Sequence, residues 1–310
     1  MPNPPRWPDG KAFAFTIFDD PDGQTLPMAR EVYALLNDLG FRTTKGVWTS
    51  RRTLESSDQG TTCDDDPAYI QWLLGLQSAG FEIGFHNATL HTSDRQQTLA
   101  GLDRFAQIFG HNPWAMANHY DCKESIYWAE YRLSGSRRLL YNLLTRGRNR
   151  GHSLGHIPDH PYFWGDFCRE RIKYVRNFVF GTINTLAACP LMPYHDPARP
   201  FVNSWYASSE GANIESFLTR VTSANLDSLE ADRGACIMYT HFGHGYVRGG
   251  QLDPRFRLTM EQLARRNGWF VPVTTLLDFL SPGPPHILSD SERSALERRW
   301  LMHKIRFGTA

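Results

Sequence analysis

Several features are scarce in this sequence, and each scarcity argues against a class of protein. The 310 residues include only five cysteines, which are scattered and form no Cys-x-x-Cys pair. We therefore expect neither a disulfide framework nor a structural zinc knot. No run of about 18 apolar residues is present, so no membrane-spanning helix is expected. Basic and acidic residues nearly balance, 33 against 32, so no global field draws the chain to nucleic acid or to an anionic membrane.

The first ten residues, MPNPPRWPDG, also lack the apolar core of a signal peptide. We therefore expect a cytoplasmic protein. A chain of 310 residues suits either two domains of ordinary size or one α/β barrel. The oligomeric state stays open, since nothing in the composition speaks to it.

Strand-like and helix-like segments alternate over the first 120 residues. Strands are expected over 12–18, 41–50, 81–85 and 113–117, and helices over 26–39, 67–80 and 92–109. Such alternation with short connections predicts a parallel sheet or barrel, with active residues at the carboxyl ends of the strands. The residues that directly follow these predicted ends are Asp19, Asp20, Trp48, His86 and His119. We expect them to share one site.

The regular alternation breaks after residue 120. We interpret 121–200 partly as further barrel elements and partly as an elaboration over the barrel mouth. Regular elements return as a helix over 213–229, a strand over 235–240, a helix over 256–267 and a strand over 269–273. A Ser-Pro-Gly-Pro-Pro linker then precedes an amphipathic helix over 289–305. We expect a barrel over 1–280, followed by a linker and C-terminal helix over 281–310.

Two adjacent carboxylates, Asp19 and Asp20, end the first predicted strand. Where a strand opens into a loop, both side chains can reach one cleft. One carboxylate can then hold a cation while the other acts as a base. A solvated acidic turn is the alternative, because turns favour Asp.

Histidines follow two further strands. His86 and His91 lie five residues apart after the third strand, and two imidazoles with one carboxylate leave open positions on a cation. Ordinary surface or core histidines are the alternative. His241 follows the strand over 235–240 and is suited to act as a general acid, with His244 as a competing candidate.

Together these motifs resemble the polysaccharide deacetylase family, within the glycoside hydrolase/deacetylase barrel superfamily. The matching stretches are Ile17-Phe-Asp-Asp20, Gly84-Phe-His86 with His91, Asn112-Pro-Trp-Ala-Met-Ala-Asn-His119 and Tyr239-Thr-His241. The resemblance covers roughly Lys11 to Phe279 and is strongest over the first 120 residues. It implies a distorted (β/α)7 barrel, a TIM-like α/β fold.

The resemblance also implies roles for individual residues. Asp19 is expected to be the catalytic base and His241 the general acid. A divalent metal, expected to be Zn²⁺, would be held by Asp20, His86 and His91. The candidate sugar-contacting residues are Trp48, His119, Tyr120 and Trp164.

Two departures from the family pattern stand out. The histidine pair is spaced five residues apart instead of four. The third motif lacks its arginine, and Ala117-Asn-His-Tyr120 stands in its place. His119 could therefore supply a replacement donor or a metal ligand.

The implied reaction is metal-assisted hydrolysis of an N- or O-acetyl group on a sugar or a sugar-containing precursor. One alternative is hydrolysis of another amide or of a glycosidic bond. A glycosidase would need two carboxylates about 5 to 9 Å apart, which requires Asp166 or Asp196 to reach the cleft. The other alternative is a carbohydrate-binding barrel without catalysis.

Overall fold

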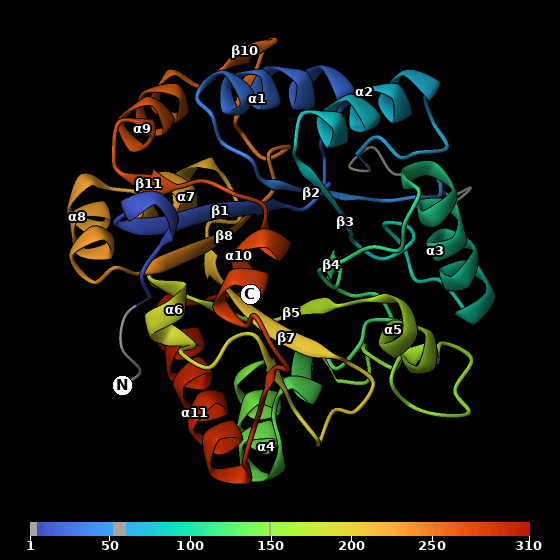
Figure 1. Cartoon of the computed structure of the whole chain (residues 1–310). Helices are drawn as coiled ribbons and strands as arrows, with labels where there is room; N and C mark the ends of the chain where they lie inside the picture. Colours follow the sequence, from blue (N-terminus) through green and yellow to red (C-terminus); the bar gives the residue numbers. More distant parts are fainter. Residues whose placement is uncertain (1–4, 52–59, 149) are drawn as a thin grey trace.

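The computed structural model describes residues 5–51, 60–148 and 150–310. At its centre seven parallel strands form a closed barrel, in which the last strand pairs back to the first (Figure 1). In order around the barrel they are β1 (Phe13–Asp19), β2 (Thr44–Val47), β3 (Glu82–Phe85), β4 (Ala115–Met116), β5 (Tyr174–Phe180), β7 (Ser204–Glu210) and β8 (Ala235–Thr240). The predicted (β/α)7 barrel is thus confirmed.

Helices and short strands complete the molecule around this barrel (Figure 1). The helices are α1 (Leu26–Asp38), α2 (Pro67–Ser78), α3 (Arg95–Phe109), α4 (Gly135–Leu144), α5 (Gly165–Arg171), α6 (Thr185–Ala188), α7 (Ile214–Arg220), α8 (Ser223–Ala231), α9 (Pro254–Ala264), α10 (Val273–Leu280) and α11 (Asp290–Phe307). The short strands are β6 (Tyr194–His195), β9 (Val247–Arg248), β10 (Gln251–Leu252), β11 (Gly268–Trp269) and β12 (His286–Ile287).

The first half of the barrel follows local sequence signals closely. Every residue of β1 is buried, as its apolar run Phe13–Phe18 predicts. Helix α2 begins as expected, with Pro67 in its first turn and the Asp66 side chain accepting a hydrogen bond from a backbone N–H. Helix α3 starts slightly later than predicted, because Asp94, not Thr92 or Ser93, forms the capping box.

Two predicted elements of the second half differ in the structure. The expected helix over 213–229 is two helices, α7 and α8, and the Thr222 side chain caps the second by accepting from the Asn225 N–H. The expected strand over 269–273 is the two-residue β11. Pro272 ends the extended segment because it has no N–H to donate, and it serves as the N-cap position of α10.

Strands β5 and β7 were not recognised in the sequence, although both are almost entirely buried. They pair with each other, and β7 also pairs with β8 to complete the barrel. β5 falls inside the segment 121–200, so this segment indeed contains a barrel element.

The C-terminal segment is attached to the barrel. Strand β12 pairs with β6, and Ser289 caps α11, which spans nearly the range expected for the C-terminal helix. Trp300 of α11 packs on Phe178 of β5 and on Tyr141 of α4, with ring centroids 5.3 and 5.8 Å apart. Among the described residues, no helix combines the length and apolar character needed to cross a membrane.

Candidate active site and metal centre

The carboxyl ends of the barrel strands bring the candidate residues together. Asp20 follows β1, His86 follows β3, His119 follows the β4 segment and His241 follows β8. Because these strands are parallel, their ends meet at one mouth of the barrel. The structure therefore gathers these four side chains in one region.

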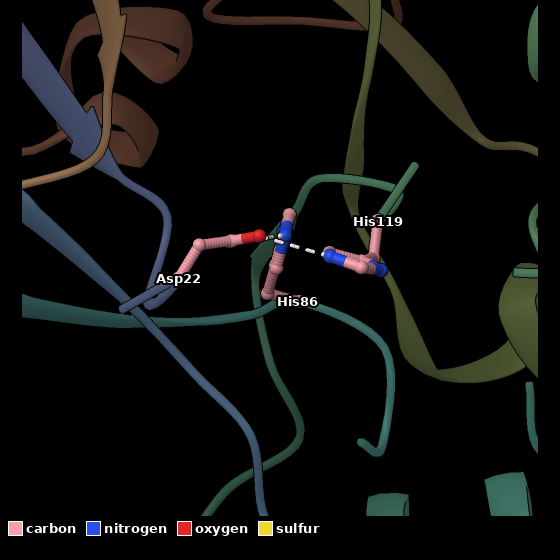
Figure 2. A group of neighbouring side chains, drawn as sticks. All are labelled: Asp22, His86 and His119. Atoms are coloured by element: carbon pink, nitrogen blue, oxygen red, sulfur yellow. Dashed lines mark hydrogen bonds and ion pairs between the residues drawn. The ribbon is translucent and has the colours of Figure 1, made fainter. Parts of the chain in front are cut away.

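A group of three side chains at this mouth has the geometry of a metal site. Asp22, His86 and His119 each offer a ligand atom, and these atoms lie within 4.8 Å of one another. Asp22 Oδ1 lies 2.9 Å from His119 Nε2, and Asp22 Oδ2 lies 3.4 Å from His86 Nε2. Figure 2 shows the three side chains converging from separate segments of the chain.

The hydrogen bonding and protonation of these three side chains are compatible with a bound cation. Both ring nitrogens of His86 and Oδ2 of Asp22 are buried without a hydrogen-bond partner, whereas buried polar atoms are normally paired. Burial lowers the pKa of His86 and thus favours the neutral ring with a free lone pair. Burial alone would raise the pKa of Asp22, but the histidines beside it hold that pKa well below its usual range. Two imidazoles and a carboxylate are a donor set that Zn²⁺ accepts, with positions left open.

Asp20 lies beside this group but is held by an arginine. Its carboxylate makes a bidentate contact with Arg176 of β5, at 3.1 and 2.5 Å. Burial would lower the pKa of Arg176, but the charge of Asp20 outweighs this effect and raises it. Asp20 Oδ1 lies 3.7 Å from His86 Nδ1, and Oδ2 lies 4.0 Å from His241 Nε2.

Asp19 has a different environment from Asp20. It is fully buried, and it pairs with Lys45 Nζ at 3.0 Å. It also accepts hydrogen bonds from Tyr33 Oη at 3.1 Å and from the Phe242 N–H at 2.9 Å. Burial raises the pKa of Asp19. Both of its oxygens are therefore engaged by the protein, and Asp19 is outside the group that could hold a cation.

His241 presents one ring nitrogen to the carboxylates. Its Nδ1 lies 2.7 Å from the Ala212 carbonyl oxygen, so Nδ1 carries a proton and donates it there. Nε2 lies 3.7 Å from Asp22 Oδ2 and 3.3 Å from Tyr239 Oη. His244 follows in the same turn, with its ring centroid 4.7 Å from that of His241.

The other predicted ligand, His91, is not part of the group that could hold a metal ion, which His119 completes instead. The backbone of His91 forms a tight turn with Thr89, whose hydroxyl bonds both its N–H and its carbonyl. The five-residue spacing from His86 places His91 in this turn.

The predicted sugar-contacting aromatics lie in three different settings. Trp48 is buried against the two candidate ligand histidines, with its ring centroid 6.1 Å from His86 and 5.7 Å from His119. Tyr120 is 63% exposed, just after His119. Trp164 is fully buried and donates to the Glu124 carbonyl at 2.6 Å, so its ring is packed inside the protein.

Neither acid that a glycosidase would need reaches the mouth. Asp166 forms an ion pair with Arg95 at 2.7 Å. Asp196 is buried in contacts with Arg199 and Arg293. Among the described residues, these two carboxylates do not join the group around His86.

Two residues of the site were missed by sequence reasoning. Asp22 was interpreted only as part of a turn, although it is a third carboxylate two positions after Asp20. Arg176 gave no signal because it lies on β5, a strand that the sequence pattern did not reveal. Arg176 contacts Asp20, so the site contains an arginine although the third sequence motif has none.

No protein-family model and no curated protein matches this sequence. Among solved structures, one named as a polysaccharide deacetylase from Mycobacterium smegmatis superposes with a TM-score of 0.54, at 12% identity over 93% of this chain and 97% of that chain. An allantoinase, Puue, gives a TM-score of 0.49 at 12% identity, with 92% and 96% of the two chains covered. A structure from Pseudomonas aeruginosa PAO1, described as a probable polysaccharide deacetylase, gives 0.45 at 11% identity, covering 97% and 94%. The first likeness confirms, for the fold, the resemblance found in the motifs.

Proposed function

We propose that this chain is a metal-dependent hydrolase that removes an N- or O-acetyl group from a sugar or a sugar-containing precursor. The observation that carries this proposal is the group of Asp22, His86 and His119 at the carboxyl ends of parallel strands. A neighbouring carboxylate, Asp20, and a histidine, His241, lie next to this group. A cation site with an adjacent acid and base is what hydrolysis of an acyl bond requires.

The proposed ligands differ from those expected from the motifs. Asp22 replaces Asp20, and His119 replaces His91, while His86 keeps its role. When bound, a divalent cation such as Zn²⁺ would polarise the acyl carbonyl and lower the pKa of a water molecule. Asp22 is 18% exposed, His119 13% and His86 2%, so the site is largely shielded from solvent.

We propose Asp20, in place of Asp19, as the base that takes the proton of the attacking water. The bidentate contact from Arg176 fixes the orientation of Asp20 and compensates its charge in a buried setting. Asp20 lies within 4.0 Å of His86 and His241, whereas Asp19 contacts Lys45, Tyr33 and the Phe242 N–H instead. We propose a structural role for Asp19, which fixes the carboxyl end of β1.

His241 is proposed to protonate the leaving amine or alkoxide through Nε2. The bond from Nδ1 to the Ala212 carbonyl fixes the ring, and Nε2 faces the carboxylates. Tyr120, which is exposed on the rim, is proposed to contact the sugar, whereas Trp48 is fully buried and packs against His86 and His119.

Acetate release tests this proposal directly. The zinc-loaded protein would be incubated with N-acetylglucosamine oligomers, a nucleotide-linked N-acetylglucosamine and peracetylated glucose. We expect turnover of at least one probe. We expect Asp20→Asn and His241→Gln to lower kcat by about 10² to 10⁴-fold without loss of metal, as removal of a general base or acid does.

His160→Gln, in a loop outside this site, is the matched control and should keep full activity. Metal binding without acetate release from any probe would overturn the proposal in favour of a non-catalytic barrel. Activity that is insensitive to both site substitutions would overturn the assigned roles.

A further inference from the structure

Helix α4 exposes an apolar face to solvent. Four leucines on it are largely uncovered: Leu139 is 72% exposed, Leu140 43%, Leu143 75% and Leu144 51%. Their spacing of one, four and five residues places them on one side of the helix. Exposed leucines scattered singly need no explanation, but four on one short helix form a contiguous apolar surface, which indicates a binding function.

The opposite side of α4 attaches the helix to the protein, and it does so largely through polar contacts. Arg137 forms an ion pair with the buried Glu297 at 2.8 Å, and Arg138 forms one with the buried Glu130 at 2.9 Å. Tyr141 is buried against Trp300 of α11, beside which α4 lies at the edge of the molecule (Figure 1). The helix is therefore oriented with its leucines outward by fixed contacts.

A basic segment follows the leucine face directly. Arg146, Arg148 and Arg150 are exposed, and no ion pair involves them among the described residues. The stretch 135–150 contains no acidic residue. Helix α4 ends at this segment, where Arg146 and Gly147 adopt positive φ values of 52° and 69°. The positive charge is thus held close to the apolar face, although the net charge of the whole chain is only +1.

We propose that α4 and the arginines after it, Arg146, Arg148 and Arg150, dock this protein on an anionic lipid surface. A short helix with an outward apolar face and adjacent arginines matches the chemistry of a bilayer interface, where acyl chains take the leucines and headgroup phosphates pair with the guanidinium groups. The helix lies on the membrane and does not cross it. The inference does not depend on the proposed deacetylase activity.

A second copy of this chain is the main competing occupant of the leucine face. Charge argues against it, because a symmetric contact through 135–150 offers Arg146, Arg148 and Arg150 no acidic partner, since that stretch contains no acidic residue. An anionic surface instead neutralises all three arginines at once. The geometry therefore favours lipid over self-association.

Vesicle co-sedimentation tests the proposal with the intact chain. We expect binding to vesicles that contain phosphatidylglycerol, much weaker binding to pure phosphatidylcholine, and release by added salt. The double variant Leu139→Ser/Leu143→Ser should weaken binding by about tenfold or more. The triple variant Arg146→Gln/Arg148→Gln/Arg150→Gln should weaken it by about a hundredfold, at about fivefold for each arginine near the surface.

Matched controls lie on α9, away from this face. Leu258 is 55% exposed and Arg257 is also exposed, so Leu258→Ser and Arg257→Gln should leave vesicle binding unchanged. Absence of binding to phosphatidylglycerol vesicles would overturn the proposal, as would binding that neither multiple variant weakens. Sedimentation equilibrium showing a dimer that Leu139→Ser/Leu143→Ser dissociates would assign the face to self-association instead.

Discussion

The two halves of the barrel contribute different groups to the same mouth. The segments after β1, β3 and β4 provide Asp22, His86 and His119, whose atoms could hold a cation. The second half, from β5 to β8, provides Arg176 and His241, which contact or face the carboxylates. The first half thus suits metal binding, whereas the second half suits the placement of charge and protons.

The halves also differ in how they are stabilised. In the first half, strands and helices alternate with short connections, the strands pack closely, and apolar side chains fill the barrel. The second half is interrupted by the long segment between β4 and β5. Both halves bury charged groups: the first half buries the pair of Asp19 and Lys45, and the second half buries Arg176. Arg132, for example, is buried between the rings of Trp128 and Trp300, 4.1 Å from each centroid. We test the second half by removing the charge partner of Asp20 on β5, and the first half by adding volume at Gly84 on β3.

Removal of the Arg176 charge should have the largest effect on stability. In Arg176→Leu the Asp20 side chain, 2% exposed, stays buried without its partner, and we expect the free energy of unfolding to fall by about 3–5 kcal/mol. Adding Asp20→Asn should restore part of this loss. Urea unfolding would measure the parent and both variants.

The surface pair of Arg95 and Asp166 provides the control. Arg95→Leu should cost about 1 kcal/mol or less, since that pair is 35% and 47% exposed. If Arg176→Leu cost no more than Arg95→Leu, the buried pair would not be stabilising the second half.

Acidification should destabilise the second half through His156. Burial lowers the pKa of His156 to about 3, against an ordinary value of 6.5. The folded state therefore favours the neutral ring, so its stability is complete above pH 6.5 and declines as the pH falls toward 3. At pH 4 this histidine should account for about 3 kcal/mol of lost stability.

His156→Gln isolates this effect, because an amide oxygen can accept the hydrogen bond that the Tyr127 N–H donates to the ring. Unfolding measured from pH 7 to pH 4 should decline less steeply in the variant than in the parent. Equal slopes would show that His156 is not the group responsible.

A methyl group at Gly84 should strain the first half. A Cβ there would lie 2.9 Å from Phe18 Cζ, 3.0 Å from Thr44 Cγ2 and 3.1 Å from the Ala115 carbonyl oxygen. We expect Gly84→Ala to lower stability by about 1–3 kcal/mol. Gly75, in helix α2, has nothing within 4 Å of the added carbon, so Gly75→Ala should raise stability by up to about 1 kcal/mol. Thermal unfolding that ranks the two variants in the reverse order would contradict this view of the packing.

The sequence predicts the fold best where each element is specified by its own residues. Strands β1 to β4 and helices α1 to α3 could be recognised from apolar periodicity, caps and stop signals. Strands β5 and β7 could not, because the long interruption removes the alternation that identifies neighbouring units. The break between α7 and α8 was missed for a related reason, since apolar spacing continues across the Thr222 cap.

The site was predictable in its location but less so in its individual residues. His86, His119 and His241 reach the mouth because each follows a parallel strand, which the pattern reveals. Side chains near a strand end alternate in direction, and the sequence does not show which carboxylate of the series Asp19, Asp20 and Asp22 turns toward the histidines. The pairing of Asp20 with Arg176 depends on tertiary contact between β1 and β5, which no local pattern encodes.

Metal content tests the central claim most directly. The parent and four variants would be incubated with zinc, dialysed and analysed for bound metal. We expect about one ion per chain in the parent, as a three-ligand zinc site implies. Asp22→Ala and His119→Ala should lose it, whereas Asp20→Asn and His91→Ala should retain it. Retention by Asp22→Ala together with loss in His91→Ala would contradict the proposed ligands, and a parent that binds no metal would contradict the hydrolase itself.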